Sequence, residues 1–442
     1  MMANRRWISV SMAFLILFTL TGCGKIEKEG KDSEINADGK IEIEFWYGLG
    51  GTLGEVMEDI IESFNASQDE IKVVGVQQSE YEETKKMIQA AVASKEVPAT
   101  ALLGFSDLRQ FANRGIMEPL DDYIAVDKDF QPEDFAESFM SYCIVNEKTY
   151  GLPAYGTTQV MYYRKDLFEK AGIDPDEAFK SWQSLAEAAE KLTVRENGET
   201  VVYGWEPMYG EENLMDIAYS NGGSILNEDG TKVILNSREW VEAWEAIRKW
   251  IHEDKIMRIH FGGDGWEYWY KTIDDVMQGR AAGYVGSSGD LADLDFTKID
   301  SHIQPGFGEN PPKPYVDAIT CGILADASGK QKEAGFKWLS YLTSAEGNSR
   351  IAMAAGYVPV RNSVMENPEF KSYIEEHPWA EVPIEQSKIG RMNFIDPTGG
   401  KIFQAITDAG DLVEIENVSA KEALDKAQKT AQQALDEYLD SK

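Results

Sequence analysis

Histidine and cysteine are scarce in this sequence, which has four histidines and three cysteines among 442 residues. Zinc and haem sites draw on these side chains. The histidines (His252, His260, His302 and His377) are isolated from one another, so we expect no metal, no cofactor and no catalytic histidine. Basic residues are also few: 43 Lys and Arg face 76 Asp and Glu, and the net charge is −33. Nucleic acids need a basic footprint, so the charge argues strongly against them as partners, and anionic lipid surfaces are disfavoured for the same reason.

The sequence also lacks the short motifs of common enzymes. It has no Gly-x-x-x-x-Gly-Lys-Ser/Thr phosphate loop, no Gly-x-Gly-x-x-Gly, no Gly-x-Ser-x-Gly and no His-Glu-x-x-His. A pair of carboxylates for glycoside hydrolysis does not stand out among so many acids. We therefore predict no catalytic residue and keep a secreted carbohydrate-active enzyme as the alternative.

The N-terminus has the pattern of an export signal. Residues 1–22 begin with Arg5 and Arg6, continue with an apolar run and end in small residues. The apolar run is too short for a confident membrane span. Leu20-Thr21-Gly22-Cys23 matches the bacterial lipobox, which predicts cleavage before Cys23 and a lipid on its thiol; an ordinary signal peptide is the alternative. Residues 23–40 are almost devoid of apolar side chains and are predicted to be a flexible tether.

Two cysteines remain after the lipobox, Cys143 and Cys321. They can form one disulfide or remain two buried thiols, because sequence spacing does not show whether their Cα atoms come within reach. We expect two buried thiols.

The first stretch after the tether alternates between strand and helix patterns. Residues 41–47 alternate apolar and polar side chains, and a helix with one apolar face follows over 53–64. Further strands are predicted at 71–76 and 99–105, with a helix at 82–94 between them. This β-α-β-α-β order is typical of a parallel sheet, whose ligand crevices lie at the carboxyl ends of the strands.

Later elements are less regular. Trp240 and Trp244 start a helical stripe that we assign to the core. Thr343-x-x-Glu346 predicts a capped helix that ends at Gly356, and Ser419-x-x-Glu422 predicts a capped last helix. Further strands are predicted at 160–163, 283–286 and 318–325, and a hairpin at 225–235.

Four stretches, in the same order, resemble the extracellular solute-binding proteins of ATP-driven importers, in the group that takes up sugars and polyols. The stretches are Phe45-Trp46-Tyr47 with its Gly-rich turn; Tyr150-Gly151-Leu152-Pro153 with residues 160–175; residues 279–289; and residues 342–346 with 356–360. The resemblance covers residues 41–440.

The resemblance implies an α/β fold with two lobes, of the type II periplasmic-binding-protein class. A ligand cleft would lie between lobes joined by hinge crossings near 150–158, 285–289 and 353–358. The lobes would close on a ligand and offer it to membrane permease subunits. It also implies a monomer outside the cytoplasm, anchored to the cell membrane through Cys23; a purely adhesive surface lipoprotein is a weaker alternative. The expected boundaries are 41–152 with 287–355 for lobe I, and 153–286 with 356–442 for lobe II.

The closest members in pattern bind glycerol-3-phosphate and glycerophosphodiesters. Ser287, Ser288, Tyr357 and Tyr81 match their ligand contacts, and Thr157 replaces a serine. Where these members have a phosphate-facing arginine, this chain has Pro397-Thr398-Gly399-Gly400, and the nearest arginine is Arg391. Arginine is the usual phosphate clamp, so we predict a carbohydrate ligand, with glycerol-3-phosphate or a glycerophosphodiester as the alternative.

Sugar binding needs flat apolar faces beside hydroxyl, amide or carboxylate groups. Trp205 and Tyr209 lie in a loop-like run, and Asp107 is a candidate hydroxyl acceptor, whereas Trp266 and Trp269 are expected to pack within a lobe. The complete predicted set of substrate-binding residues is Tyr47, Tyr81, Asp107, Thr157, Thr158, Trp205, Tyr209, Ser287, Ser288 and Tyr357.

Overall fold

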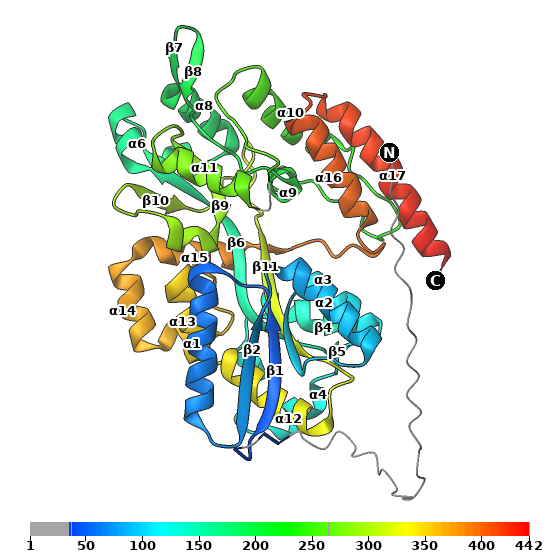
Figure 1. Ribbon diagram of the computed structural model, residues 1–442. Helices are drawn as coiled ribbons and strands as arrows, with labels where there is room; N and C mark the ends of the chain where they lie inside the picture. Colours follow the sequence, from blue (N-terminus) through cyan, green and yellow to red (C-terminus); the bar gives the residue numbers. More distant parts are fainter. Residues whose placement is uncertain (1–34, 37, 264–265, 442) are drawn as a thin grey trace, which may run out of the picture.

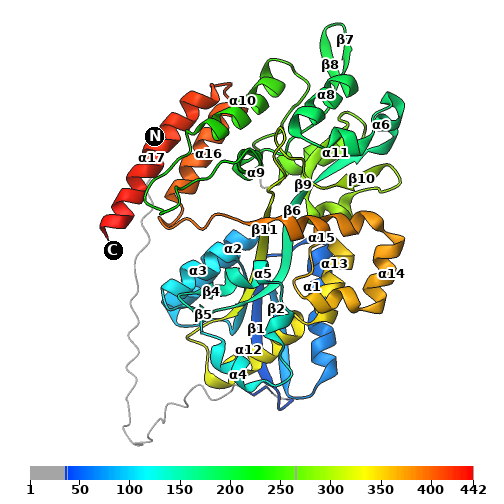
Figure 2. The same ribbon diagram turned by 180° about the vertical axis from the view of Figure 1, so that it is seen from behind.

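The computed structural model describes residues 35–36, 38–263 and 266–441. The chain forms two lobes, one above the other in Figures 1 and 2. The predicted export signal and the lipobox with Cys23 lie outside the described residues, as does most of the tether. The described end of the tether forms a turn in which Asn36 Oδ1 accepts from the backbone N–H of Asp38 and Lys40, both at 3.0 Å. Within the described ranges, no helix is both long and apolar enough for a membrane span.

The lower lobe begins with the predicted β-α-β-α-β order. Strand β1 lies between β2 and β3 and is parallel to both. Alternate side chains of β1, including Ile43 and Phe45, are fully or almost fully buried, as the alternation predicts. The elements are β1 (Ile41–Tyr47), α1 (Gly51–Ser67), β2 (Ile71–Gln77), α2 (Tyr81–Ser94), β3 (Thr100–Gly104) and α3 (Phe105–Asn113).

Two strands run from one lobe into the other. They are β6 (Leu152–Arg164) and β11 (Tyr315–Ile323), which pair antiparallel along the boundary between the lobes. In the lower lobe β11 pairs with β3, and in the upper lobe β6 pairs with β9 (Gly283–Ser287) and β10 (Ile299–His302). One sheet therefore runs through both lobes, in the order β10-β6-β11-β3-β1-β2.

The upper lobe is mainly helical around an aromatic core. Trp182, Trp240 and Trp244 are almost completely buried, which confirms the predicted core stripe. The helices that contribute to this core are α6 (Lys165–Ala171), α7 (Pro175–Ala178), α8 (Trp182–Leu192), α9 (Glu211–Ser220), α10 (Arg238–His252), α16 (Lys401–Glu414) and α17 (Ala420–Asp440).

A helical group covers the back of the two crossing strands. Helix α15 (Val382–Ile389) passes in front of β6 and β11 in Figure 2, which shows the molecule from behind. Its side chain Gln386 donates to Thr158 Oγ1 on β6 at 2.8 Å. The opposite face of these strands is the one seen in Figure 1.

The remaining elements complete both lobes. The helices are α4 (Asp121–Val126), α5 (Glu137–Met140), α11 (Glu267–Met277), α12 (Gly329–Leu342), α13 (Ala345–Ala355) and α14 (Pro368–Glu376). The short strands are β4 (Ile144–Val145), β5 (Lys148–Thr149), β7 (Val194–Glu196), β8 (Glu199–Val202) and β12 (Arg391–Met392). The 3₁₀ turns are η1 (Pro132–Asp134), η2 (Ser141–Cys143), η3 (Ser288–Asp293), η4 (Asn362–Glu366) and η5 (Pro378–Glu381).

Packing differs from the expected lobe boundaries at two places. Phe307 belongs to the core of the upper lobe, although 287–355 was expected in the lower one. Val358 and Val360 belong to the core of the lower lobe, although lobe II was expected to resume at 356. The reason is that the chain returns to the lower lobe through β11 and not through the segment near residue 287. A strand pattern in the sequence does not show which of the two cores the flanking residues join.

Local predictions mostly hold. Gly356 ends α13 in the left-handed region with φ 82°, and Ser419 caps α17. The cap of α13 is Ser344 and not Thr343, whose hydroxyl instead donates to the carbonyl of Leu339 at 2.8 Å. The predicted hairpin at 225–235 is reduced to a single bridge between Leu226 and Val233.

The two cysteines of the folded part are free and buried. Cys143 lies in η2 and Cys321 in β11, and neither forms a disulfide. The prediction of two buried thiols is confirmed. Burial raises the pKa of both thiols, which keeps them protonated and unreactive.

Candidate functional site

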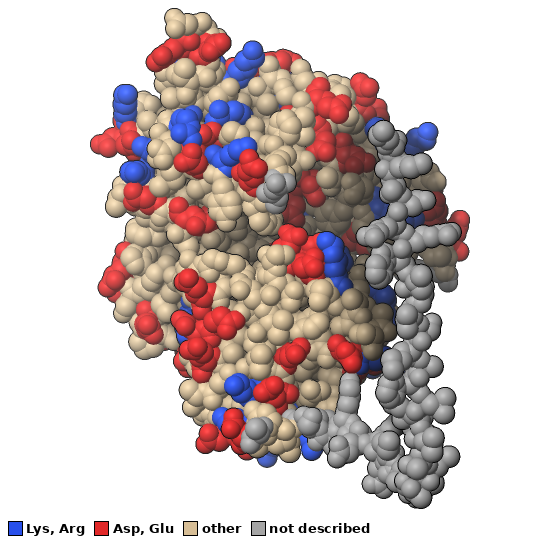
Figure 3. Space-filling view, in the orientation of Figure 1, with Lys and Arg blue, Asp and Glu red and all other residues tan. Residues whose placement is uncertain are grey.

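The front face of the crossing strands is the floor of a hollow between the lobes. Thr157 on β6 lies opposite Asp317 on β11, so their side chains share one face of the sheet. Thr157, Asp317 and Ile319 are the partly exposed side chains of these pairing segments, and their direct neighbours are buried. Figure 3 shows the molecule hollowed between the lobes on this side, with acidic side chains around the rim.

Three predicted hydroxyls meet on this floor. Thr157 Oγ1 lies 3.3 Å from Ser287 Oγ and 3.4 Å from Ser288 Oγ. Ser287 also accepts from the backbone N–H of Gly289 at 3.1 Å, which fixes the start of η3. Ser288 is fully buried, so Thr157 and Ser287 are the two hydroxyls of this group that solvent or a ligand can reach.

Thr158 does not belong to the floor, and its prediction as a binding residue is wrong. Successive side chains of a strand point to opposite faces, so Thr157 and Thr158 cannot share a ligand. Thr158 is fully buried on the back, where its hydroxyl donates to the carbonyl of Tyr315 at 2.7 Å.

Tyrosines form the lower wall of the hollow. The hydroxyls of Tyr81 and Tyr155 lie 2.6 Å apart, and the rings of Tyr155 and Tyr357 have centroids 4.6 Å apart. Tyr357 lies against η3: a Cβ added to Gly289 would be 2.7 Å from the Tyr357 hydroxyl. Burial raises the pKa of Tyr81 to about 12, and it raises the pKa of Tyr357 as well, so both hydroxyls remain protonated and able to donate.

The upper wall carries exposed aromatic rings at the start of α11. Trp266 is 55% exposed and Tyr270 is 58% exposed. Trp266 meets Trp269 edge-on with centroids 5.9 Å apart, and Trp269 Nε1 donates to Asp290 Oδ1 at 3.0 Å. The prediction that Trp266 packs within a lobe is wrong, because it stands at the cap position of α11, beyond the part of the helix that the core covers. Trp269 does pack partly against the core.

Three other predicted residues are held by protein partners. Trp205 is fully buried beside Phe179, and Tyr47 is fully buried and bonds to Glu58. Tyr209 is partly exposed, and its hydroxyl donates to Asp411 at 2.5 Å. Trp205 and Tyr47 are therefore core residues and not part of the floor. Trp205 lies in a loop-like run, which gives no signal of what covers the ring, and Tyr47 continues the buried face of β1.

Asp107 lies in the first turn of α3, beside α2. Its carboxylate receives a salt bridge from Lys85 Nζ at 2.9 Å, and 14% of the side chain is exposed. Burial raises the pKa of Asp107, whereas Lys85 opposes that effect. The remaining lone pairs of the Asp107 carboxylate can accept a hydrogen bond from a ligand hydroxyl, but Lys85 already balances its charge.

Sequence reasoning missed a polar group at the inner end of the floor. Tyr315 donates to Glu212 Oε2 at 2.8 Å and receives a bond from Gln159 Nε2 at 3.1 Å. Glu212 lies in the first turn of α9, and Asp317 lies on β11. Burial is the largest cause of the raised pKa of both carboxyl groups, and the charge of Glu212 raises the pKa of Asp317 further. No sequence motif predicts this group, because its residues belong to α9, β6 and β11, which lie far apart in the sequence.

Arg391 is the arginine nearest to the segment that replaces the phosphate-facing arginine of the related proteins, and it already has partners within this protein. Its Nη2 donates to Asp216 Oδ1 at 2.8 Å, and its guanidinium lies 3.7 Å from the centroid of the Tyr219 ring. Asp216 is fully buried; burial raises its pKa to about 7, and Arg391 opposes the rise. The guanidinium is thus paired within the protein.

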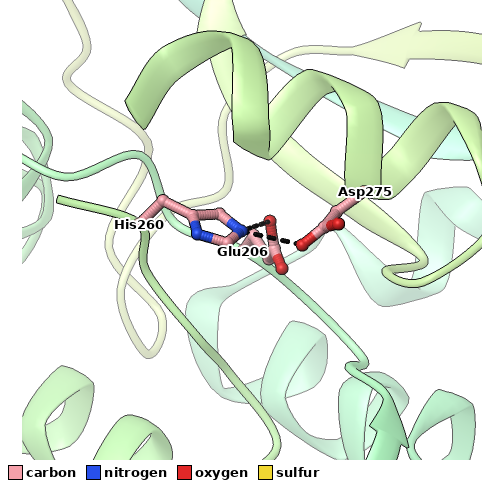
Figure 4. Close-up of side chains that lie close together, drawn as sticks. All are labelled: Glu206, His260 and Asp275. Atoms are coloured by element: carbon pink, nitrogen blue, oxygen red, sulfur yellow. Dashed lines mark hydrogen bonds and ion pairs between the residues drawn. The ribbon is translucent and has the colours of Figure 1, made fainter. Parts of the chain in front are cut away.

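A second unpredicted group combines Glu206, His260 and Asp275 (Figure 4). His260 Nε2 lies 2.7 Å from Asp275 Oδ2. Arg258 donates to Glu206 Oε1 at 2.8 Å and also to Asp275, and Arg280 Nε lies 2.5 Å from the other oxygen of Asp275.

The charges of this group argue for a structural ion network. Arg258 contacts both Glu206 and Asp275, and Arg280 contacts Asp275, so the protein's own guanidiniums already supply positive charge to this group. Asp275 belongs to α11, so the network ties the helix with the exposed aromatic rings to the segment around Glu206. Burial raises the pKa of Glu206 to about 8, and Glu206 Oε2 has no hydrogen-bond partner.

Comparisons with known proteins agree with this architecture. The family described as bacterial extracellular solute-binding protein matches residues 59–378. The sn-glycerol-3-phosphate-binding periplasmic protein UgpB of Yersinia pestis is 26% identical over 368 residues, which cover 79% of this chain and 81% of that protein.

Two solved structures illustrate the shared fold. The ABC substrate-binding protein Lmo0181 from Listeria monocytogenes, in complex with cycloalternan, has a TM-score of 0.77 and 23% identity, over 89% of this chain and 99% of that chain. UgpB from Mycobacterium tuberculosis, in complex with glycerophosphocholine, has a TM-score of 0.77 and 20% identity, over 90% of this chain and 99% of that chain. These matches confirm the predicted two-lobe α/β fold.

Proposed function

Because the chain belongs to the bacterial extracellular solute-binding proteins, we propose that it captures a carbohydrate outside the cytoplasm and delivers it to the permease of an ATP-driven importer. The single observation behind the choice of ligand is the composition of the hollow between the lobes. Hydroxyls of Thr157 and Ser287 lie on its floor, and exposed rings of Trp266 and Tyr270 lie at the start of α11. Flat rings pack against the C–H faces of sugars, and hydroxyls meet sugar hydroxyls.

Binding and release follow from the two-lobe architecture. A ligand on the floor would contact Tyr81 and Tyr357 from the lower lobe and α11 from the upper lobe. Contacts made only when both lobes touch the ligand stabilise a closed form, and the crossing strands β6 and β11 would bend as the lobes approach. The closed form is the one that the permease would receive. We propose a binding protein and not an enzyme, which the membership of the solute-binding family supports.

The N-terminus completes the proposal. A lipid on Cys23 would anchor the mature chain to the cell membrane, and the tether would leave the lobes free to reach the permease. We propose that the chain acts as a monomer, with lobe I at 41–152 and lobe II following from 153. From the packing described above, we place the return of the chain to the lower lobe at β11. We place its later return to the upper lobe after residue 390.

A second candidate is a glycerol-3-phosphate or glycerophosphodiester ligand. It is supported by the likeness to the Yersinia pestis protein and to the structure with glycerophosphocholine. The pairing of Arg391 with Asp216 weighs against it, because this guanidinium already has an acidic partner within the protein.

A thermal-shift panel tests the proposal. It would contain monosaccharides, oligosaccharides, polyols, glycerol-3-phosphate and glycerophosphocholine, with each ligand recovered afterwards and analysed for turnover. Stabilisation by a sugar that is recovered intact supports the proposal. Stabilisation by the phosphate compounds alone would favour the second candidate, and cleavage of an oligosaccharide would indicate an enzyme.

A further inference from the structure

The inner end of the cleft floor carries two carboxyl groups, those of Glu212 and Asp317. Tyr315 donates to Glu212 Oε2 at 2.8 Å, and Asp317 is two residues from Tyr315 on β11, so the two side chains of β11 lie on the same face. The charge of Glu212 raises the pKa of Asp317, which agrees with this placement. In the described part of the chain, neither lies within 4.0 Å of a Lys, Arg or His nitrogen, whereas the neighbouring Asp216 is paired with Arg391. The floor therefore presents two carboxyl groups without an ion-pair partner.

Gln159 adds an acceptor that no protein group satisfies. Its side chain is 7% exposed, and its Nε2 donates to Tyr315, the residue that also bonds Glu212. Its Oε1 is buried and has no partner. Gln159 is two residues from Thr157 on β6, so both side chains project from the floor face. A buried acceptor without a partner is unfavourable, and a donor on a ligand would supply the missing hydrogen bond.

Aromatic rings complete these surroundings. Tyr268 lies close enough to Glu212 for that carboxylate to raise its pKa, although burial is the larger cause. Tyr268 meets the ring of Tyr209 edge-on with centroids 5.5 Å apart. Carboxylates beside aromatic faces are the surroundings that bind ammonium groups best, through ion pairing together with cation–π attraction.

We infer that the ligand carries an ammonium group that binds between Glu212, Asp317 and Gln159 Oε1, and that its chemical class is an amino sugar, free or within an oligosaccharide. This inference rests on the proposed carbohydrate-binding function and narrows it. The ammonium group donates to the three acceptors, while sugar hydroxyls on the same molecule reach Thr157 and Ser287. An ammonium group favours the ionised form of these two carboxyl groups, whose pKa values burial raises, whereas a neutral sugar offers them no positive charge.

Matched pairs of ligands test this inference by calorimetry at pH 7. Glucosamine is compared with glucose, galactosamine with galactose, and glucosamine oligosaccharides with their N-acetylated counterparts. Spermidine and calcium chloride are included as cations without a sugar. We expect the amine of at least one pair to bind ten-fold or more tightly than its neutral counterpart.

Three variants distinguish a specific contribution of Glu212 and Asp317 to amine binding from a general effect of removing negative charge. Asp317→Asn and Glu212→Gln keep side-chain size but remove the charge, and each should weaken amine binding at least ten-fold while changing neutral-sugar binding less than three-fold. Asp326→Asn removes an exposed carboxylate near the end of β11 and should leave both unchanged. Melting temperatures of the free variants identify any that fail to fold, and the second charge variant then carries the test.

The outcomes distinguish this inference from the proposed function. A neutral sugar that binds as tightly as its amine, or more tightly, overturns the inference and leaves carbohydrate binding standing. Spermidine binding that depends on Asp317 supports an ammonium site and contradicts a sugar ligand. Stabilisation by calcium alone, lost in Asp317→Asn, would replace the ammonium site with a cation site. No binding by any member contradicts both proposals.

Discussion

Arg391 donates to the buried carboxylate of Asp216 at 2.8 Å and stacks on Tyr219, so the guanidinium nearest the phosphate position of related proteins is held within this one. A phosphate ligand that displaced that carboxylate would break a charge-assisted hydrogen bond, and the remaining unpaired donor nitrogen of this guanidinium, Nε, is buried. Since charge-assisted hydrogen bonds contribute about 1.5–3 kcal/mol, the displacement is unfavourable.

We therefore expect glycerol-3-phosphate to stabilise the protein less than the best carbohydrate at equal concentration. Thermal shift provides the first measurement and calorimetry the second. Tight glycerol-3-phosphate binding that disappears in Arg391→Ala would show that the arginine changes partner and would contradict this expectation.

Gly289→Ala should disturb the lower wall of the cleft. A Cβ at this position would lie 2.7 Å from the Tyr357 hydroxyl, so the ring would have to move. We expect ligand affinity to fall about ten-fold or more, with a modest loss of melting temperature. Gly329→Ala is a matched control, because a Cβ there meets nothing within 4 Å. Unchanged affinity in Gly289→Ala would indicate that Tyr357 is not positioned by η3.

Tyr357→Ala should weaken ligand binding more than Ser287→Ala. The tyrosine contributes both a hydroxyl and a ring, whereas the serine contributes one hydrogen bond of about 0.5–1.5 kcal/mol. Ser288→Ala should have little effect on affinity, because Ser288 is fully buried. Calorimetry measures the affinities, and the melting temperatures of the free variants serve as a folding control. Normal binding by Tyr357→Ala would return this residue to a packing role.

The free energy of unfolding should fall as pH rises from about 5 to 8. Burial raises the pKa of Glu206 to about 8 and that of Asp216 to about 7, so the folded state holds protons that the unfolded state has released above its ordinary carboxyl pKa. The stabilisation is thus present at low pH and lost as pH rises through these values.

Glu206→Gln tests the largest of these contributions. Each proton held only by the folded state gives a slope of about 1.4 kcal/mol per pH unit, so the variant should show a flatter pH profile in urea unfolding. Glu196→Gln, at an exposed position in β7, should retain the original profile. A profile for Glu206→Gln as steep as that of the natural protein would mean that Glu206 is ionised in the folded state.

Cys23→Ala should release the protein from membranes. The lipobox predicts that Cys23 is the first mature residue and carries the lipid anchor. Fractionation of cells followed by mass spectrometry of the N-terminus measures both points. A natural chain found in the soluble fraction with an unmodified Cys23 would exclude the anchor.

Local sequence patterns determined much of the fold. The alternation of residues 41–47, the apolar faces of the following helices and the glycine at 356 act over short distances, so the β-α-β-α-β start and the end of α13 could be predicted. The family resemblance supplied the two-lobe architecture, and with it the meeting of Thr157, Ser287 and Tyr357 near η3. These features depend on neighbours in sequence or on a pattern shared across the family.

Only the tertiary structure decided which of the predicted side chains can reach a ligand. Thr157 and Thr158 look equivalent in sequence, but strand alternation placed one on the floor and packing of α15 covered the other. Trp205 is buried and Trp266 is exposed. The exposure of each ring depends on which distant segments of the chain pack against it. The partners of Arg391, and the meeting of Glu212 with Asp317, join segments more than 100 residues apart, and no local pattern encodes contacts at that separation.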